Sequence, residues 1–249
     1  RYRLMMFCES LLDRRREIVS GLYGSYKLSL NLADRGLQSS FYYFLPECYE
    51  LETQRYIMKF VEPAMVTVDV GAHLGLFTIL LAHQVGPQGK VYSFEPEAKN
   101  FLSLKRNVEL NYLMWVHPFQ MALSNRTGED VLVINLSDSA HALDGALGNH
   151  LRPSDVLRQT VKTITLDNFV EREKISRIDL IKIDAEQSEH LILEGAKRSF
   201  AKGVISQVIC EIHSTSKQHG AGRDSVRKAF YSYGYKSFVL NPTLSKKNF

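Results

Sequence analysis

The stretch that decides the fold lies at residues 66–75 and reads Val66-Thr67-Val68-Asp69-Val70-Gly71-Ala72-His73-Leu74-Gly75. Residues 65–70 are nearly all apolar or β-branched, which is typical of a strand that helices cover on both faces. Gly71 ends this strand, and an apolar helix is expected from residue 76 onward. Glycine lacks a Cβ atom, so the backbone can turn tightly here and approach a ligand closely. The stretch therefore predicts an α/β protein with a ligand site at the end of this strand.

A second predicted strand ends at Glu95. An acidic side chain at the carboxyl end of this strand can accept hydrogen bonds from both hydroxyls of a ribose. The pattern Gly71-x-x-x-Gly75 lacks the second glycine of a dinucleotide fingerprint, because His73 stands there. Asp69 adds a negative charge, which repels a diphosphate and attracts a sulfonium cation. These features favour S-adenosylmethionine as the cofactor over NAD, and a purely structural glycine turn is the alternative.

The composition is that of a protein with one sizeable core. The chain has 249 residues, of which 45% are hydrophobic and 10% aromatic. The net charge of +4 and the isoelectric point near 8.9 are mildly basic. Basic residues are scattered apart from the run at 14–16, so nucleic acid is not an expected partner. Cys8, Cys48 and Cys210 are far apart, which predicts reduced thiols in a cytoplasmic protein. No apolar segment approaches the ~20 residues that cross a bilayer, and no signal-peptide pattern is found.

The first 60 residues are expected to form an appendage to a catalytic domain at residues 61–249. Its expected elements are an amphipathic helix that ends at Gly21, a hairpin of strands 27–32 and 40–45, and a helix over residues 49–60. The hairpin is rich in aromatic residues at 41–44. These aromatics either line an acceptor pocket or pack within their own domain.

The catalytic domain alternates predicted strands and helices, which indicates a mostly parallel sheet. Its further expected strands are a core strand at 116–123, an antiparallel return at 131–135, a short strand at 161–166, core strands at 178–183 and 204–212, and a closing strand at 235–240. Four helices are expected in this domain. The first ends near Asn111, the second begins with Asp167 as its cap, the third includes residues 191–200, and the fourth ends at Gly234. Residues 136–160 show no sustained period, so they are either a lid or acceptor loop, or a disordered insertion.

Candidate site residues follow five of the predicted strands. Because the carboxyl ends of parallel strands meet at one edge of a sheet, ligands bind there in open α/β proteins. Several acidic groups at that edge indicate a functional site. The residues concerned are Asp69, Glu95, Ala122 with Leu123, Asp184, and Glu211 with His213.

Four motifs in this order resemble the FkbM-type family of S-adenosylmethionine-dependent methyltransferases. They lie at residues 69–75, 94–96, 165–167 and 178–186, and the likeness runs from about residue 66 to residue 240. The resemblance implies a Rossmann-like class I methyltransferase fold and, most commonly, O-methylation of sugars and secondary metabolites. It also implies that glycines approach the cofactor, an acidic residue holds the ribose, and the third strand's end lies along the adenine. The expected cofactor-binding residues are Asp69, Gly71, Ala72, His73, Gly75, Glu95, Pro96, Ala122 and Leu123.

Two positions depart from the family pattern. His73 stands where the family usually has Asn, and it keeps a polar side chain there. Gln187 stands where the family usually has Gly, within Asp184-Ala185-Glu186-Gln187-Ser188-Glu189. If that glycine needs a positive φ or lets a substrate come close, the acceptor side of the site is altered in this chain.

An alcohol acceptor must lose a proton when it attacks a methyl group, so the site needs a base. His213 and Asp184 are the candidates, although His213 could equally pair with Glu211 for structural reasons. The expected catalytic residues are Asp184, Glu186, Glu211 and His213. The same four residues could hold a divalent metal ion, which is the less favoured interpretation.

The sequence thus predicts an S-adenosylmethionine-dependent O-methyltransferase that acts on a small molecule or sugar and releases S-adenosylhomocysteine. One alternative is a methyltransferase that acts on RNA or protein. A second is a catalytically silent cofactor-binding module, which the Gln187 departure supports. A third, a nicotinamide dehydrogenase, is disfavoured by the missing fingerprint glycine.

Overall fold

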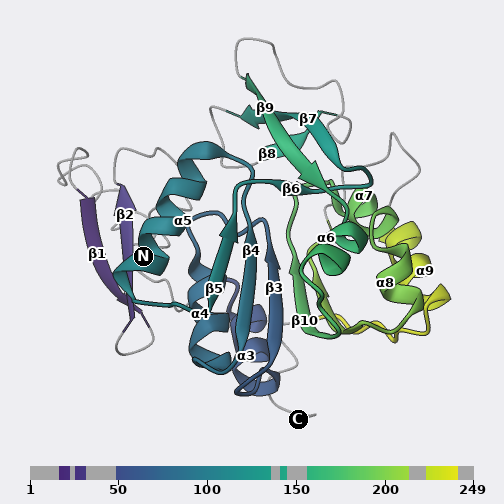
Figure 1. Cartoon of the computed structure of the whole chain (residues 1–249), viewed down its shortest axis with the longest axis horizontal. Helices are drawn as coiled ribbons and strands as arrows, with labels where there is room; N and C mark the ends of the chain where they lie inside the picture. The colour runs from purple at the N-terminus through teal and green to yellow at the C-terminus, as the bar shows by residue number, and fades with distance from the viewer. Residues whose placement is uncertain are drawn as a thin grey trace.

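The computed structural model describes residues 17–22, 26–31, 49–135, 141–144, 156–212 and 223–240. A parallel five-stranded sheet forms its centre (Figure 1), with the order β11 (Ile205–Cys210), β10 (Ile178–Ile183), β3 (Val66–Val70), β4 (Lys90–Phe94) and β5 (Val116–Phe119). The strand order reverses at β3, which has β4 on one side and β10 on the other. Ligands bind at such a reversal in doubly wound sheets. The predicted Rossmann-like α/β fold is confirmed.

Helices cover both faces of this sheet (Figure 1). One face carries α3 (Leu51–Phe60), α4 (Leu76–Val85) and α5 (Ala98–Leu110), and the other carries α6 (Leu166–Arg172), α7 (Glu189–Glu194), α8 (Lys197–Ala201) and α9 (Arg223–Ser232). Each layer has its own hydrophobic core. Helix α4 is buried over most of its surface, which explains why its sequence is apolar on all sides. None of the described helices has the length and apolar character that a membrane span needs.

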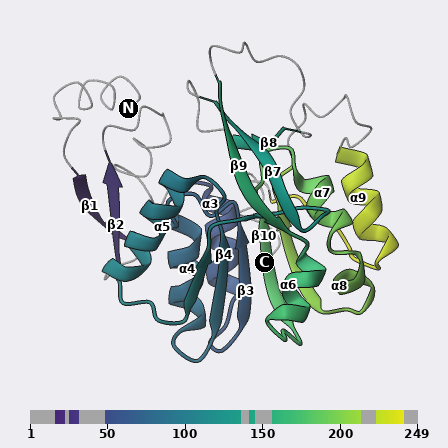
Figure 2. The same cartoon turned by 45° about the horizontal axis from the view of Figure 1, so that its top comes forward.

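A second sheet of four strands lies over the carboxyl ends of the central strands (Figure 2). Its order is β6 (Ala122–Leu123), β9 (Val156–Ile164), β7 (Gly128–Asn135) and β8 (His141–Leu143). The expected single strand at 116–123 is therefore wrong. It splits into β5 and β6, because Ala122 and Leu123 pair with Thr163 and Ile164 of β9. The return strand β7 is antiparallel to β9 and β8, not to the strand before it.

Two other segments differ from the expectation. Residues 136–160 contain β8 and the first half of β9, so this segment is not one long loop; residues 136–140 and 145–155 lie outside the described part. Residues 235–240 are described and form no strand. Strand pairing depends on partners far away in the sequence, so local alternation misplaces such edges.

The N-terminal part begins with an antiparallel hairpin of β1 (Glu17–Leu22) and β2 (Tyr26–Asn31). The helix expected up to Gly21 is therefore wrong over β1, because pairing with β2 overrides the helical spacing. Strand β2 confirms the first expected strand, but its partner is β1; residues 32–48, with the second expected strand and its aromatics, lie outside the described part.

Side chains of α5 dock this hairpin onto the domain. Asn107 and Asn111 lie one turn apart on α5, and each exchanges two hydrogen bonds of 2.7–3.2 Å with the backbone of β2, at Ser29 and Lys27 respectively. Helix α3 is confirmed, and its Ile57 is fully buried in the core beside α4. The expected appendage is thus partly built into the core, and a domain boundary at residue 60 stays a prediction.

The N-cap of α6 differs from the one expected from the sequence. Thr165, not Asp167, caps α6, by accepting a hydrogen bond from the Asn168 N–H at 3.1 Å. Asp167 already lies in the first turn of α6, and it accepts bonds from the N–H groups of Arg198 and Ser199 at the start of α8. The helix expected over residues 191–200 accordingly breaks into α7 and α8.

Candidate active site

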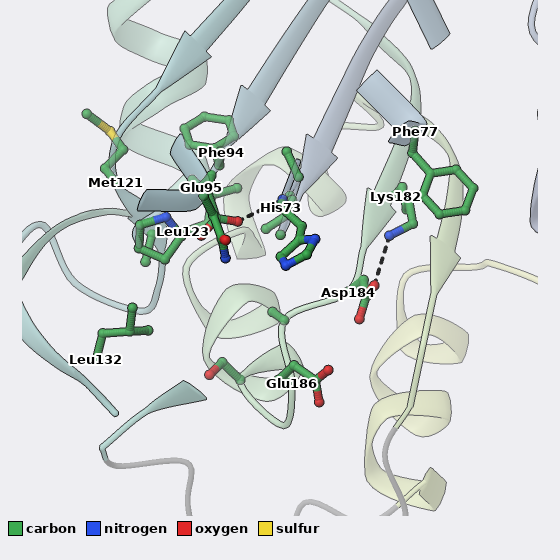
Figure 3. Close-up of a pocket in the computed structure, with 18 of the residues that line it drawn as sticks. His73, Phe77, Phe94, Glu95, Met121, Leu123, Leu132, Lys182, Asp184 and Glu186 are labelled. Carbon is green, nitrogen blue, oxygen red and sulfur yellow. Dashed lines mark hydrogen bonds and ion pairs between the residues drawn. The ribbon is translucent and has the colours of Figure 1, made fainter. Parts of the chain in front are cut away.

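A cleft of about 860 Å³, counted out to bulk solvent, opens at the carboxyl ends of β3, β4 and β10. Figure 3 shows two groups of labelled side chains, one on each side of His73. The Glu95 end includes Phe94, Glu95, Met121 and Leu123, and the Lys182 end includes Phe77, Lys182 and Asp184. Leu132 and Leu143 of the second sheet also line the cleft.

The turn after β3 draws these strand ends together. Gly71 has a φ of +76°, and a Cβ atom on it would lie 1.8 Å from the carbonyl oxygen of Asp184. No side chain fits there, because the backbone after β10 crosses directly over the glycine. The N–H groups of Gly71 and Ala72 both donate to the Phe94 carbonyl at 3.0 Å. The predicted glycine is thus required by backbone packing as well as by its place on the pocket wall.

The next two positions of the motif have different roles. His73 lines the pocket with a φ of +51°, a conformation that Asn adopts more readily than most residues, which gives a physical reason for the usual Asn. Gly75 has a φ of +94° and precedes α4, but it does not line the pocket. A Cβ atom on Gly75 would lie 2.8 Å from the side chain of Leu104. Gly75 is therefore needed for packing of α4 against α5.

Glu95 is buried at the end of β4, where it lines the pocket. Its Oε2 accepts a hydrogen bond from the His73 N–H at 2.8 Å, and its Oε1 accepts one from the Glu97 N–H at 3.0 Å. Burial raises the pKa of Glu95 to about 7, although both backbone donors favour the charged form. A carboxylate has about four acceptor sites, so two bonds leave capacity for hydroxyl groups of a ligand.

Asn100 adds a hydrogen-bond donor to the same part of the pocket. Its side-chain amide is buried and lies near enough to Glu95 to favour the charged form of that carboxyl, which lowers the pKa of Glu95. The amide nitrogen makes no hydrogen bond of ordinary geometry with the described residues, so a ligand or water atom can engage it. The wall beside it is mostly apolar and includes the expected residues Pro96, Ala122 and Leu123. The Glu95 end therefore combines polar groups with a surface that suits a planar base.

The Lys182 end is built around a buried ammonium that the sequence analysis missed. Lys182 is 2% exposed, and its Nζ lies 3.1 Å from Asp184 Oδ2 and 4.5 Å from the centre of the Phe77 ring. Burial alone would lower the pKa of Lys182, but Asp184, Asp69 and Glu50 together raise it above its ordinary value. Lys182 is therefore a fixed cation at neutral pH. The signal was a lysine flanked by isoleucines in a strand whose other charged residue, Asp179, lies near its start.

Asp69, an expected cofactor-binding residue, does not line the pocket. The side chain is fully buried, and its Oδ2 accepts a hydrogen bond from Thr78 Oγ1 of α4 at 2.6 Å. Burial raises the pKa of Asp69, while the charge of Lys182 and the Thr78 bond oppose the shift. Asp69 thus acts on the pocket through Lys182.

Glu50 is a further pocket residue that the sequence analysis missed. It directly precedes α3 and has a left-handed backbone, with φ 44° and ψ 51°. Carboxylate oxygens of Glu50, Asp184 and Glu211 all lie within 4.8 Å of one another. Burial raises the pKa of Glu50 to about 7; Lys182 lowers it, and Asp184 and Glu211 raise it further. No local sequence pattern marks Glu50, because only the fold brings it beside β10 and β11.

The expected catalytic residues are brought together only in part. Asp184 and Glu186 line the pocket, and Glu211 lies beside Asp184 at its edge without lining it. His213 lies outside the described residues. Of the four residues expected as possible metal ligands, Asp184 and Glu211 lie together beside Glu50, and Glu186 does not belong to this carboxylate group. Lys182 interacts with Asp184 and Glu50 of the same group.

Gln187 has the positive φ that would explain why the family usually has a glycine at this position. Gln187 has a φ of +78°, and Glu186 before it has a φ of +43°. Both residues are in the left-handed region, which costs a side-chain-bearing residue roughly 1–2 kcal/mol. A glycine at residue 187 would avoid this cost, so the family's glycine has a conformational reason.

The family model of the methyltransferase FkbM domain matches residues 69–237, more than half of the chain. The chain therefore belongs to the FkbM methyltransferase family. Hexuronic acid methyltransferase AglP of Haloferax volcanii is 27% identical over 165 residues, which cover 66% of this chain and 63% of AglP. The 31-O-demethyl-FK506 methyltransferase FkbM of Streptomyces tacrolimicus is 27% identical over 193 residues, which cover 66% and 72%.

Most of the curated relatives are matched over less than two thirds of their own length. Among solved structures, the TYW2 protein of M. jannaschii in complex with AdoMet superposes with a TM-score of 0.49 at 16% identity, over 92% of this chain and 78% of that one.

Proposed function

We propose that this chain transfers a methyl group from S-adenosylmethionine to a hydroxyl oxygen of a sugar or small secondary metabolite and releases S-adenosylhomocysteine. The observation that carries the proposal is Glu95, a buried carboxylate that ends β4 and faces the pocket with acceptor capacity to spare. Membership of the FkbM methyltransferase family supports the reaction type.

The residues present fit this cofactor. Glu95 would accept the ribose hydroxyls, and the Asn100 amide would donate to a polar atom of the nucleoside. Leu123 and Met121 offer apolar surface for the adenine. At the Lys182 end, the carboxyl groups of Asp184, Asp69 and Glu50 surround one described ammonium, which favours the positively charged sulfonium of the cofactor over an anion. When bound, S-adenosylmethionine supplies the methyl group, and the protein positions the acceptor and excludes water.

The acceptor is proposed to sit at the Lys182 end, against Asp184 and Glu186, beneath Leu132 and Leu143 of the second sheet. The excess of carboxylates there disfavours an anionic acceptor group next to the methyl and favours a neutral hydroxyl. The names of the two relatives describe a hexuronic acid and a demethylated macrolide as substrates of those proteins. A small hydroxyl compound is therefore our first choice over RNA or protein.

Calorimetric titration with S-adenosylhomocysteine and NAD tests the cofactor. We expect S-adenosylhomocysteine to bind and NAD not to bind; tight NAD binding without a response to S-adenosylhomocysteine would contradict the assignment. Transfer of a labelled methyl group is then measured with methyl glucoside, glucuronic acid and a macrolide alcohol. Cofactor binding without methylation of any of the three favours a silent cofactor-binding module.

The cytoplasmic location expected from the cysteines stays a prediction.

A further inference from the structure

The side chain of Glu50 does not cap the backbone of its own helix. It occupies the position before α3, where an acidic side chain usually accepts a hydrogen bond from the first helical N–H groups, yet its side chain makes no such bond. Its left-handed backbone is strained for a residue with a side chain. Instead, its carboxylate lines the pocket beside Asp184. Strain of this kind gathers at functional sites, where the surrounding structure maintains it.

We propose that Glu50, which precedes the matched family domain, is the base that accepts the proton of the acceptor hydroxyl. This inference rests on the proposed function and adds a residue to its site. Residue 50 lies outside the matched range of 69–237, so the family match does not assign it a role.

Glu50 suits this role better than Asp184, the base expected from the sequence. Asp184 Oδ2 is engaged with the ammonium of Lys182 at 3.1 Å, which leaves this oxygen less free to accept the proton of an acceptor hydroxyl. A base is most effective when its pKa lies near the working pH. Burial holds the pKa of Glu50 at about 7, so it can both take up and release a proton.

Four charged or polar groups of the described residues act on Glu50. Lys182 belongs to β10, Asp184 follows β10, Glu211 follows β11, and Thr53 belongs to α3. Lys182 and the Thr53 bond favour the carboxylate, whereas Asp184, Glu211 and burial favour the neutral acid. These opposing influences keep Glu50 ready to exchange a proton near neutral pH.

The acceptor oxygen forms a new O–C bond with the methyl carbon while the C–S bond of the cofactor breaks. The electron pair of the broken C–S bond stays on the sulfur, which becomes a neutral thioether. The hydroxyl proton moves to a carboxylate oxygen of Glu50, which later loses it to solvent. No oxidant or further reactant is needed.

The first test compares the wild type with Glu50→Gln, which keeps the size of the side chain but cannot take up the proton. With the hydroxyl compound of the panel that the wild type methylates fastest, we expect kcat to fall by roughly 10²–10⁴-fold while the S-adenosylhomocysteine affinity changes less than threefold. Glu62→Gln, at an exposed residue just after α3, is the matched control and should keep full activity.

The outcomes separate the two proposals. A wild type that binds the cofactor but methylates no panel compound contradicts the proposed function. An active wild type with an equally active Glu50→Gln contradicts the role of Glu50 alone. The role of Glu50 is also contradicted if His213→Ala abolishes turnover and Glu50→Gln does not, because the proton then goes to the imidazole of His213.

The second test needs no acceptor. Carboxyl ¹³C resonances of labelled glutamate are followed by NMR against pH, and the signal that is absent from Glu50→Gln identifies Glu50. We expect this signal to titrate near pH 7 in the wild type. Titration near the ordinary value of about 4.3 would overturn the assignment, because such a carboxylate is too weak a base for this role.

Discussion

The two ends of the pocket stabilise a buried charge with different kinds of partner. At the Glu95 end, one carboxylate is held by two backbone N–H groups, both from residues close to the ends of β3 and β4. At the Lys182 end, the ammonium is surrounded by side chains from α3, β3 and the segment after β10. The backbone donors belong to the turns that follow the strands, whereas the side-chain partners lie on separate elements of the fold. The Glu95 end is therefore a local feature of the chain, and the Lys182 end is a product of the whole fold.

The strongest test of this contrast removes the central cation. Lys182→Met should lower the free energy of unfolding by about 3–5 kcal/mol, because Asp184, Asp69 and Glu50 lose their buried counter-charge. Urea unfolding at pH 8 measures the effect. The matched control is Lys105→Met, whose ammonium is exposed and pairs only with an exposed Glu109, and which should cost less than 1 kcal/mol. An equal, small loss in both variants would show that the Lys182 end is well solvated.

The pH dependence of stability probes the Glu95 end. The pKa of Glu95 is raised from 4.5 to about 7 in the folded protein, so the folded state binds the proton more tightly than the unfolded chain. Its contribution to stability is fully present below about pH 4.5 and is lost as the pH rises through 7. Between pH 5 and 8 the wild type should lose about 2–3 kcal/mol more than Glu95→Gln, as measured by urea unfolding at both pH values. Parallel pH profiles of the two proteins would refute this burial effect.

Cofactor affinity tests the role of Glu95 directly. Glu95→Ala removes two charge-assisted hydrogen bonds to the ribose, each worth roughly 1.5–3 kcal/mol, and should weaken S-adenosylhomocysteine binding at least tenfold. Calorimetry at pH 8, where the carboxylate is charged, is the measurement. Glu109→Ala at an exposed position of α5 serves as the control. If the folded Glu95→Ala protein binds as tightly as the wild type, the ribose lies elsewhere.

The smallest expected effect concerns the strained turn after Asp184. Gln187→Gly should raise the free energy of unfolding by about 1 kcal/mol, because glycine accepts a φ of +78° without cost. Gln187→Ala removes the same side-chain atoms but keeps a Cβ atom, so it should bring no gain. Thermal unfolding of the three proteins compares them. A gain in both variants would assign the effect to the glutamine side chain instead of the backbone.

The sequence predicted the elements that local patterns govern. The strands β3, β4 and β10 and the helices α3, α4 and α5 lie where apolar spacing and glycine turns place them. The second sheet was missed, because β6 and β9 find their partners across long stretches of chain. Glu17–Leu22 forms a strand although its apolar residues are spaced as in a helix, because it pairs with the adjacent β2 in a hairpin. Pairing with a partner strand outweighs the weak local propensity of such short segments.

The motifs along the chain are enough to identify the family, the order of the central elements and the place of Glu95 at the end of β4, because each of these depends on a short stretch of sequence. Only the tertiary structure decided what Asp69, Lys182 and Glu50 do. Asp69 turned out not to line the pocket, and Lys182 and Glu50 joined it from elements far apart in the sequence. The physical reason is that charge interactions in a buried site depend on distance in space and on burial, and neither can be read from the spacing of residues along the chain.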